Sequence, residues 1–207
     1  MMTQIGEVLS ACGTFFLYAV MAVFSQNVIF TRALGVSRLV KLVDDDNVDS
    51  MTFGLLLCAV QLIGAPIAYA ANLFLVPLSY RAYLRPLVYV ACAGISFFIV
   101  LLLVAVFLRN KGAKDIIMVL PMATFNCAVL GTMLIATTQS FSFLQTMGFA
   151  LGTSVGYLLA IFVVTEGQRK LQNRKVPAPF RGLPITLLYI GVLAVAIYGF
   201  TGHMMAF

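Results

Sequence analysis

The chain has 207 residues, of which 62% are hydrophobic and 10% are charged, with thirteen Lys and Arg against seven Asp and Glu. Its mean hydropathy is +1.03, whereas soluble domains are about 45–50% apolar and about 25% charged. A water-soluble globule of this size has no way to bury so much apolar surface. Disordered, collagen-like and coiled-coil chains are excluded as well, and four cysteines do not make a disulfide scaffold at this length. The composition predicts an all-α integral membrane protein.

Six apolar stretches are long enough to cross a bilayer, which takes about 20 residues in a helix. All six are predicted helices, because hydrocarbon requires internally bonded backbone and no stretch alternates with the period of a strand. No linker interrupts the array, so residues 1–207 form one predicted domain. The predicted spans are Val8–Phe30, Met51–Leu75, Leu87–Leu108, Ile116–Thr137, Phe143–Thr165 and Ile185–Met205.

The basic residues gather in alternate loops. By the positive-inside rule the first, third and fifth loops face the cytoplasm and both termini face outward. A charge excess distributed in this way reflects topology, so no nucleic-acid partner is expected. The cytoplasmic set is Arg32, Arg38, Lys41, Arg109, Lys111, Lys114, Arg169, Lys170, Arg174, Lys175 and Arg181, and the outer loops hold only Arg81 and Arg85. The first loop also carries an acidic cluster, Asp44, Asp45, Asp46 and Asp49. It is read as a solvated turn that caps the second span through Asp49 or Ser50, or as a docking surface for a cationic partner.

Two short segments echo each other weakly. Gln26–Phe30 and Phe125–Val129 lie in the first and fourth spans, which occupy equivalent places in two halves of three spans each. Consecutive halves with an odd number of spans insert in opposite orientations, as in the inverted repeats of many transporters. The predicted repeats cover about residues 1–110 and 111–207, and Pro121 is expected to open the backbone before Asn126.

The fifth span carries glycines four residues apart, at Gly148, Gly152 and Gly156. Small residues at this spacing clear one stripe of a helix and let another helix approach closely. The stripe therefore predicts helix packing, within the bundle or against a partner chain.

Polar side chains at membrane depth are the candidate functional residues. Asn27 and Asn126 must find partners there, either as structural bonds between helices or as parts of a site. Cys127 follows Asn126 and is either a small buried hydrophobe or a ligand. The acidic residues Glu7 and Glu166 lie at helix ends, as does Asp115, so no proton relay is indicated. The remaining cysteines have no metal-ligand spacing and are read as packing residues: Cys12, Cys58 and Cys92.

Three segments together resemble the Rnf/Nqr family of membrane subunits. Leu120–Gly131 (LPMATFNCAVLG) resembles the motif of that family's fourth helix, and Gln26-Asn27 followed by Leu34–Ser37 resembles the end of its first helix. Val176–Gly182 (VPAPFRG) resembles the last cytoplasmic loop of the RnfA branch. Length, six helices and outward termini extend the resemblance over the whole chain and favour the RnfA/NqrE half of the subunit pair.

The resemblance implies a subunit of an ion-translocating complex in the bacterial cytoplasmic membrane that passes electrons between ferredoxin and NAD, coupled to Na⁺ or H⁺. It implies a sister subunit of opposite topology, of the RnfE/NqrD type, and one [2Fe–2S] cluster shared by the pair, with two cysteines from each. Cys127 matches one ligand position, and Asn27 and Asn126 would hold the ligand geometry. The chain alone would not be an enzyme.

One family residue is missing. Ser37 stands at or near the place of the second cysteine, or the segment with that cysteine is deleted. A serine alkoxide replaces a thiolate at iron poorly, so the set of four cysteines would be incomplete unless Cys58 reaches over from the second span. Two alternatives therefore stay open: a diverged subunit without the cluster that serves as scaffold or ion path, and a standalone carrier of small solutes.

Overall fold

The computed structural model describes residues 2–44, 50–77, 80–107, 113–171 and 177–201. Within these ranges all regular structure is helical, and none of the described residues forms a strand. The α-helices are α1 (Met2–Val23), α2 (Val36–Asp44), α3 (Ser50–Leu75), α4 (Arg81–Phe107), α5 (Ala113–Thr124), α6 (Cys127–Thr138), α7 (Phe143–Leu171) and α8 (Leu183–Thr201), and a 3₁₀ turn, η1, covers Ala178–Phe180.

Five of the helices are long and apolar enough to cross a membrane, namely α1, α3, α4, α7 and α8. Helices α5 and α6 together, which are bent by 41° at a short break, form either a sixth, broken span or a re-entrant loop. The chain is thus an all-α, multi-pass membrane protein. The described part of the predicted fourth span is not one continuous helix, because Phe125 and Asn126 interrupt it.

The predicted first span is wrong at its C-terminal end. Helix α1 stops at Val23, and the chain then runs through turns until α2 begins at Val36. The physical reason is Asn27, whose side-chain oxygen accepts the backbone N–H groups of Ile29 and Phe30 and so replaces helical bonds. Asparagine can compete with the helix ladder because its short side chain bonds to nearby backbone groups.

Helix α2 occupies nine residues of the loop expected after the first span. Its buried residues Leu39, Val40 and Leu42 pack on the bundle while Lys41 faces outward, the pattern of a short amphipathic helix. The acidic cluster that was expected to form a solvated turn lies outside the described residues, apart from Asp44 at the end of α2. Asp49, the first candidate cap of the second span, lies outside the described residues, and α3 begins at Ser50.

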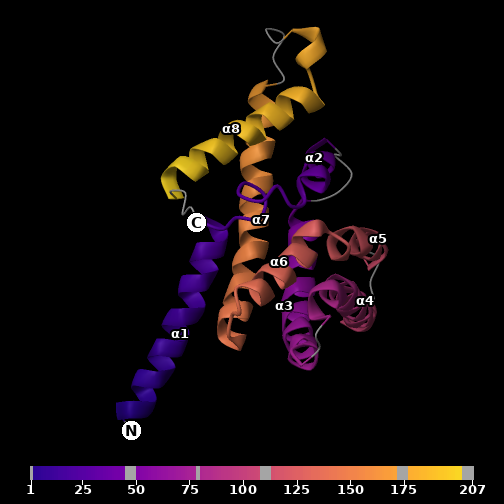
Figure 1. The fold of residues 1–207 in the computed structure, drawn as a ribbon. Helices are drawn as coiled ribbons and strands as arrows, with labels where there is room; N and C mark the ends of the chain where they lie inside the picture. The colour runs from indigo at the N-terminus through magenta and orange to yellow at the C-terminus, as the bar shows by residue number, and fades with distance from the viewer. Residues whose placement is uncertain (1, 45–49, 78–79, 108–112, 172–176, 202–207) are drawn as a thin grey trace.

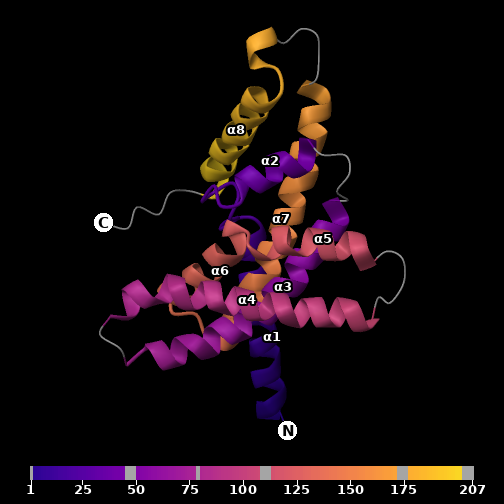
Figure 2. The same cartoon turned by 90° about the vertical axis from the view of Figure 1, so that its right-hand side faces the viewer.

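Helix α7 lies at the centre of the molecule. Figure 1 shows it between α1 on one side and α3, with α4 and α5 beyond, on the other, in agreement with the contacts of these helices. Figure 2 shows α3 and α4 running side by side, joined by a short connection. Helix α8 packs mainly on α7, and only Thr186 and Ile190 are buried on it.

The glycine stripe brings α1 against α7. A Cβ at Gly148 or Gly152 would overlap the backbone carbonyl oxygen of Phe15 or Ala19, both on α1. The prediction of close helix packing is confirmed, and the partner is α1 of the same chain. The two backbones lie closer than any side chain at these positions would permit.

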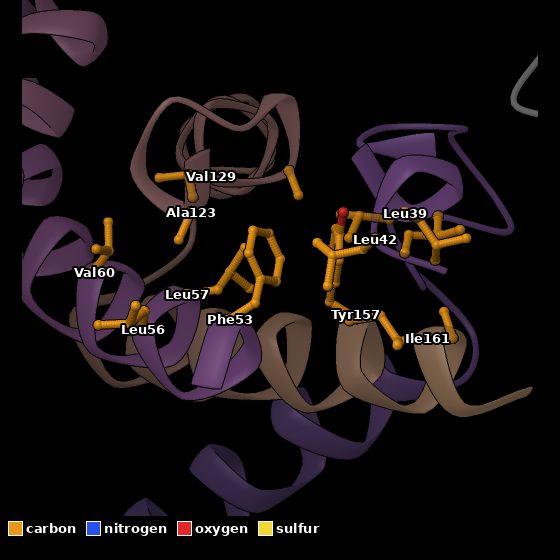
Figure 3. Close-up of a cluster of buried hydrophobic side chains, with 14 of the residues drawn as sticks. Leu39, Leu42, Phe53, Leu56, Leu57, Val60, Ala123, Val129, Tyr157 and Ile161 are labelled. Carbon is orange, nitrogen blue, oxygen red and sulfur yellow. The ribbon is translucent and has the colours of Figure 1, made fainter. Parts of the chain in front are cut away.

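The core forms where α2, α3, α5, α6 and α7 meet. Figure 3 shows Phe53 of α3 beside Tyr157 of α7, with Leu39 and Leu42 on one side and Val129 on the other. The rings of Phe53 and Tyr157 have centroids 5.7 Å apart. The outer faces of α1, α4 and α8 stay apolar and exposed, as suits contact with lipid or a partner; they include Phe16, Leu17, Val20, Phe98, Leu102, Val106, Val192 and Val195.

Candidate functional site at two helix breaks

The break between α1 and α2 lies against the break between α5 and α6. Gly35, the last residue before α2, has φ +85°, and a Cβ built on it would lie 2.9 Å from Oδ1 of Asn126 and 2.8 Å from the ring of Tyr157. Two interruptions far apart in sequence thus meet beside the middle of α7. Irregular backbone inside a membrane bundle is tolerated where other parts of the protein enclose it.

Asn27 ties the first break to α7. Its Nδ2 donates to the carbonyl oxygens of Val23 (2.9 Å) and Gly156 (3.1 Å). Its Oδ1 accepts from the N–H groups of Ile29 (3.0 Å) and Phe30 (3.3 Å), and the residue is 1% exposed. The expectation that this amide finds a partner on another helix is confirmed, because Gly156 belongs to α7.

Asn126 restarts the helix at the second break. It has extended backbone (φ −96°, ψ 138°), and its Oδ1 accepts the N–H of Ala128 at 3.1 Å, so that it caps α6. Its Nδ2 is buried without a hydrogen-bond partner. The bond to the N–H two residues ahead is the one that Asn27 makes to Ile29. Asn126 is therefore a cap, with one donor left free inside the site.

Tyr157 joins both breaks and was not singled out in the sequence. Its hydroxyl donates to the carbonyl oxygen of Gly35 at 3.0 Å. Its ring and Oδ1 of Asn126 both lie within 3 Å of the Cβ position of Gly35, so it also adjoins the second break. A tyrosine in an apolar span carries no pattern of its own, since only the fold brings a carbonyl from residue 35 to it.

Replacing Gly35 with alanine tests this meeting point. The left-handed backbone disfavours any side chain, and the added methyl would also press on Tyr157 and Asn126. We expect Gly35→Ala to lower the free energy of unfolding by about 2 kcal/mol. Gly182 is the matched control, because it has φ +81° and no atom within 4 Å of its Cβ position. A thermal unfolding midpoint no lower for Gly35→Ala than for Gly182→Ala would contradict the contact.

Cys127 is the first residue of α6, and its free thiol is exposed. Its interpretation as a small buried hydrophobe is therefore wrong. The helix restarts at this residue, so its side chain points away from the core that Ala128 and Val129 enter. The site thus presents a thiol on the outside of the chain, next to a buried amide and a buried tyrosine.

Comparison with known proteins assigns the fold to a family. Residues 15–204 match the family described as Rnf-Nqr subunit, membrane protein. The chain belongs to the Rnf-Nqr family. The helix breaks and Cys127 all lie inside the matched range.

Three relatives of this Rnf-Nqr chain carry informative names. The A-type subunit of the ion-translocating oxidoreductase complex of Edwardsiella ictaluri is 35% identical over 74% of this chain and 79% of its own length. The protein of that name from Syntrophotalea carbinolica is 45% identical, over 40% of this chain and 43% of its own length. The A-type subunit of the Na(+)-translocating ferredoxin:NAD(+) oxidoreductase complex of Acetobacterium woodii is 39% identical, over 40% of this chain and 43% of its own length. The match to this Rnf-Nqr chain thus spans less than half the length of two of them.

The donor set of this Rnf-Nqr chain supplies one thiol at the breaks. Ser37, in the first turn of α2, is exposed and lies two residues beyond Gly35. Cys58 is half-buried and faces Ser154 on α7, while Cys92 is buried in α4. Within the ranges that the structure describes, no three His, Cys, Asp or Glu residues gather as a metal site. At the helix breaks the described residues thus offer one exposed thiol, at Cys127, beside the exposed hydroxyl of Ser37.

The other predicted residues take ordinary places. Glu166 is exposed and pairs with Arg169 at 2.9 Å, one turn along α7. Cys12 lies exposed on α1. The side chain of Asp115 lies outside the part that is described. Neither Glu166 nor Cys12 belongs to the helix breaks.

Proposed function

We propose that this chain is the RnfA-type membrane subunit of an ion-translocating oxidoreductase complex, which carries electrons between ferredoxin and NAD coupled to Na⁺ or H⁺ movement. The observation that carries the proposal is the 35% identity to the A-type subunit of such a complex over 79% of that protein. The chain alone performs no catalysis; nicotinamide and flavin chemistry belong to other subunits. Its place is the bacterial cytoplasmic membrane.

The proposed architecture is an inverted pair of three-helix repeats with both termini outside. Its support is the matched role of Asn27 and Asn126, each of which follows a helix and accepts the N–H two residues ahead. The distribution of Lys and Arg supports the orientation. The corresponding partner is a sister subunit of the RnfE/NqrD type inserted the other way up.

The proposed cofactor is one [2Fe–2S] cluster shared with that sister subunit, for which Cys127 is this chain's single thiolate. Thiolates hold such clusters in a site whose potential depends on burial and hydrogen bonds. Cys127 is suited to sharing because its side chain is exposed at the surface where a second chain can reach it. Asn126, with its free Nδ2, stands behind the thiol and would help to hold the geometry around it, while Asn27 holds the first break.

The decisive experiment is to purify the chain anaerobically with its membrane partner and to measure iron, acid-labile sulfide and visible absorption. We expect about two iron and two sulfide per pair, and we expect Cys127→Ser to remove both while the pair stays intact. Cys12→Ser is the matched control, because Cys12 is also an exposed thiol but lies far along α1 from the breaks.

A second function is favoured by Ser37. If an intact pair contains no iron, the chain is a diverged subunit that keeps the fold as scaffold or as part of the ion path. The exposed hydroxyl in the first turn of α2, where the family resemblance places a cysteine, favours this alternative. Failure of any opposite-topology subunit to co-purify would contradict both functions.

A further inference from the structure

A cavity lies between α3, α6 and α7, away from the exposed thiol. The space that water centres can occupy in it is about 30 Å³. This corresponds to room for about two water-sized particles. It is lined by Gln61, Ala65, Ala68, Tyr69, Asn72, Val129, Thr132, Met133, Ala136, Thr137, Ser140, Phe141, Thr146 and Ala150.

Gln61 is the deepest polar side chain of this cavity. It is 2% exposed, and neither Oε1 nor Nε2 has a hydrogen-bond partner. Oδ1 of Asn72, about three helix turns further along α3, is also buried and unpaired. Each unpaired buried polar group costs about 1–3 kcal/mol, so three of them around one space indicate an occupant with which they bond.

The hydroxyls of the cavity act as acceptors. Thr132 donates its proton to the carbonyl oxygen of Ala128 at 2.7 Å, and Thr146 donates to that of Ser142 at 2.9 Å. Their lone pairs are what remains for an occupant. The hydroxyl oxygens, Oε1 of Gln61 and Oδ1 of Asn72 form a set of hard oxygen acceptors in the cavity. Nε2 of Gln61 is a free amide donor beside them.

No charged side chain lines the cavity among the residues that the structure describes. A divalent cation would lack the carboxylates that such ions need, and an anion would meet mostly lone pairs. We propose that the cavity binds a partly hydrated monovalent cation of the size of sodium. Oε1 of Gln61 and the hydroxyl oxygen of Thr132 supply ligands, and a water on the cation extends toward Oδ1 of Asn72, which lies too far along α3 to reach the same ion directly.

The position of the cavity gives the bound ion a route. Ser140 is exposed and Asn72 is half-buried, so the cavity reaches the surface beside the ends of α3 and α6. Its inner end includes Val129, whose N–H bonds to the carbonyl oxygen of Asn126 at the second break. An ion at Gln61 therefore lies between the protein surface near Ser140 and the helix breaks. Reading this as part of an ion path rests on the proposed function, whereas binding itself does not.

Cation-dependent stability of the purified full-length chain tests the proposal. Its thermal unfolding in detergent is followed by circular dichroism in choline chloride, with NaCl or KCl replacing choline at constant ionic strength. A ligand at one hundred times its Kd is expected to raise the midpoint of a chain of this size by about 5–10 °C. We expect this rise with NaCl, and one bound ²²Na⁺ per chain.

Variants assign the binding to the cavity. Gln61→Leu is expected to abolish the sodium-dependent rise, and Thr132→Val, which keeps the shape of the side chain, to weaken the apparent affinity by about tenfold. Gln168→Leu is the matched control, because Gln168 is a buried glutamine of α7 outside the cavity. If Gln61→Leu does not fold, Thr132→Val carries the test alone.

Two outcomes overturn the proposal. The first is that sodium does not raise the unfolding midpoint of the wild-type chain. The second is that sodium raises the midpoint of Thr132→Val, and of Gln61→Leu if that variant folds, as much as it raises that of the wild type. The first means that the cavity holds water only. Neither outcome touches the proposed function, which depends on co-purification and iron content. Conversely, a sodium-dependent rise together with failure of any sister subunit to co-purify would keep the cation site and refute the complex.

Discussion

Asn27→Ala is expected to lower the free energy of unfolding by about 4 kcal/mol. The change leaves the N–H groups of Ile29 and Phe30 and the carbonyl oxygen of Gly156 without their side-chain partner in a buried place. Water is not available there to replace the lost bonds. The midpoint of thermal unfolding in detergent should fall by about 8–16 °C.

Gln26→Ala is the matched control for Asn27. Gln26 is the preceding residue in the same turn, and its Oε1 is buried without a partner. Removing that amide takes away an unpaired group, so the midpoint should stay close to that of the wild type. Equal losses for the two variants would mean that the segment 24–35 depends on side-chain volume and not on the Asn27 bonds.

Gly152→Ala is the second large change, with an expected loss of about 3 kcal/mol of unfolding free energy. The new methyl would lie 2.8 Å from both the carbonyl carbon and the Cα of Ala19 and would overlap the carbonyl oxygen as well. These are backbone atoms of α1, which cannot turn aside as a flexible side chain does. Helix α1 must therefore move away from α7, and the unfolding midpoint should fall by about 6–12 °C.

Gly94→Ala provides the control for helix propensity. Gly94 lies inside α4 and has no atom within 4 Å of its Cβ position. Alanine there should stabilise the helix by about 0.5–1 kcal/mol. A similar gain in Gly152→Ala would show that α1 does not pack on α7 as closely as the glycine stripe indicates.

The sequence by itself determined the class of the protein and the residues to consider first. A chain that is 62% hydrophobic cannot hide its apolar surface in water, and hydrocarbon about 30 Å thick sets the length of each span. Asn27 and Asn126 stood out because an amide at membrane depth must be bonded. The glycine stripe of α7 indicated a close helix contact, because residues four apart along a helix share a face and glycine leaves that face without side chains.

Only the tertiary structure decided how these residues work. Cys127 is exposed because the helix restarts at that residue, and an apolar pattern carries no mark of a restart. In the sequence, Tyr157 and Gln61 look like ordinary residues of apolar helices. The fold brings the carbonyl oxygen of Gly35 to the hydroxyl of Tyr157. It also places Gln61 in the lining of a cavity together with Asn72 and Thr132. Periodicity reports which face of a helix is buried, whereas the pairing of polar groups depends on which helices meet. That pairing is set by long-range packing around α7, which local sequence does not encode.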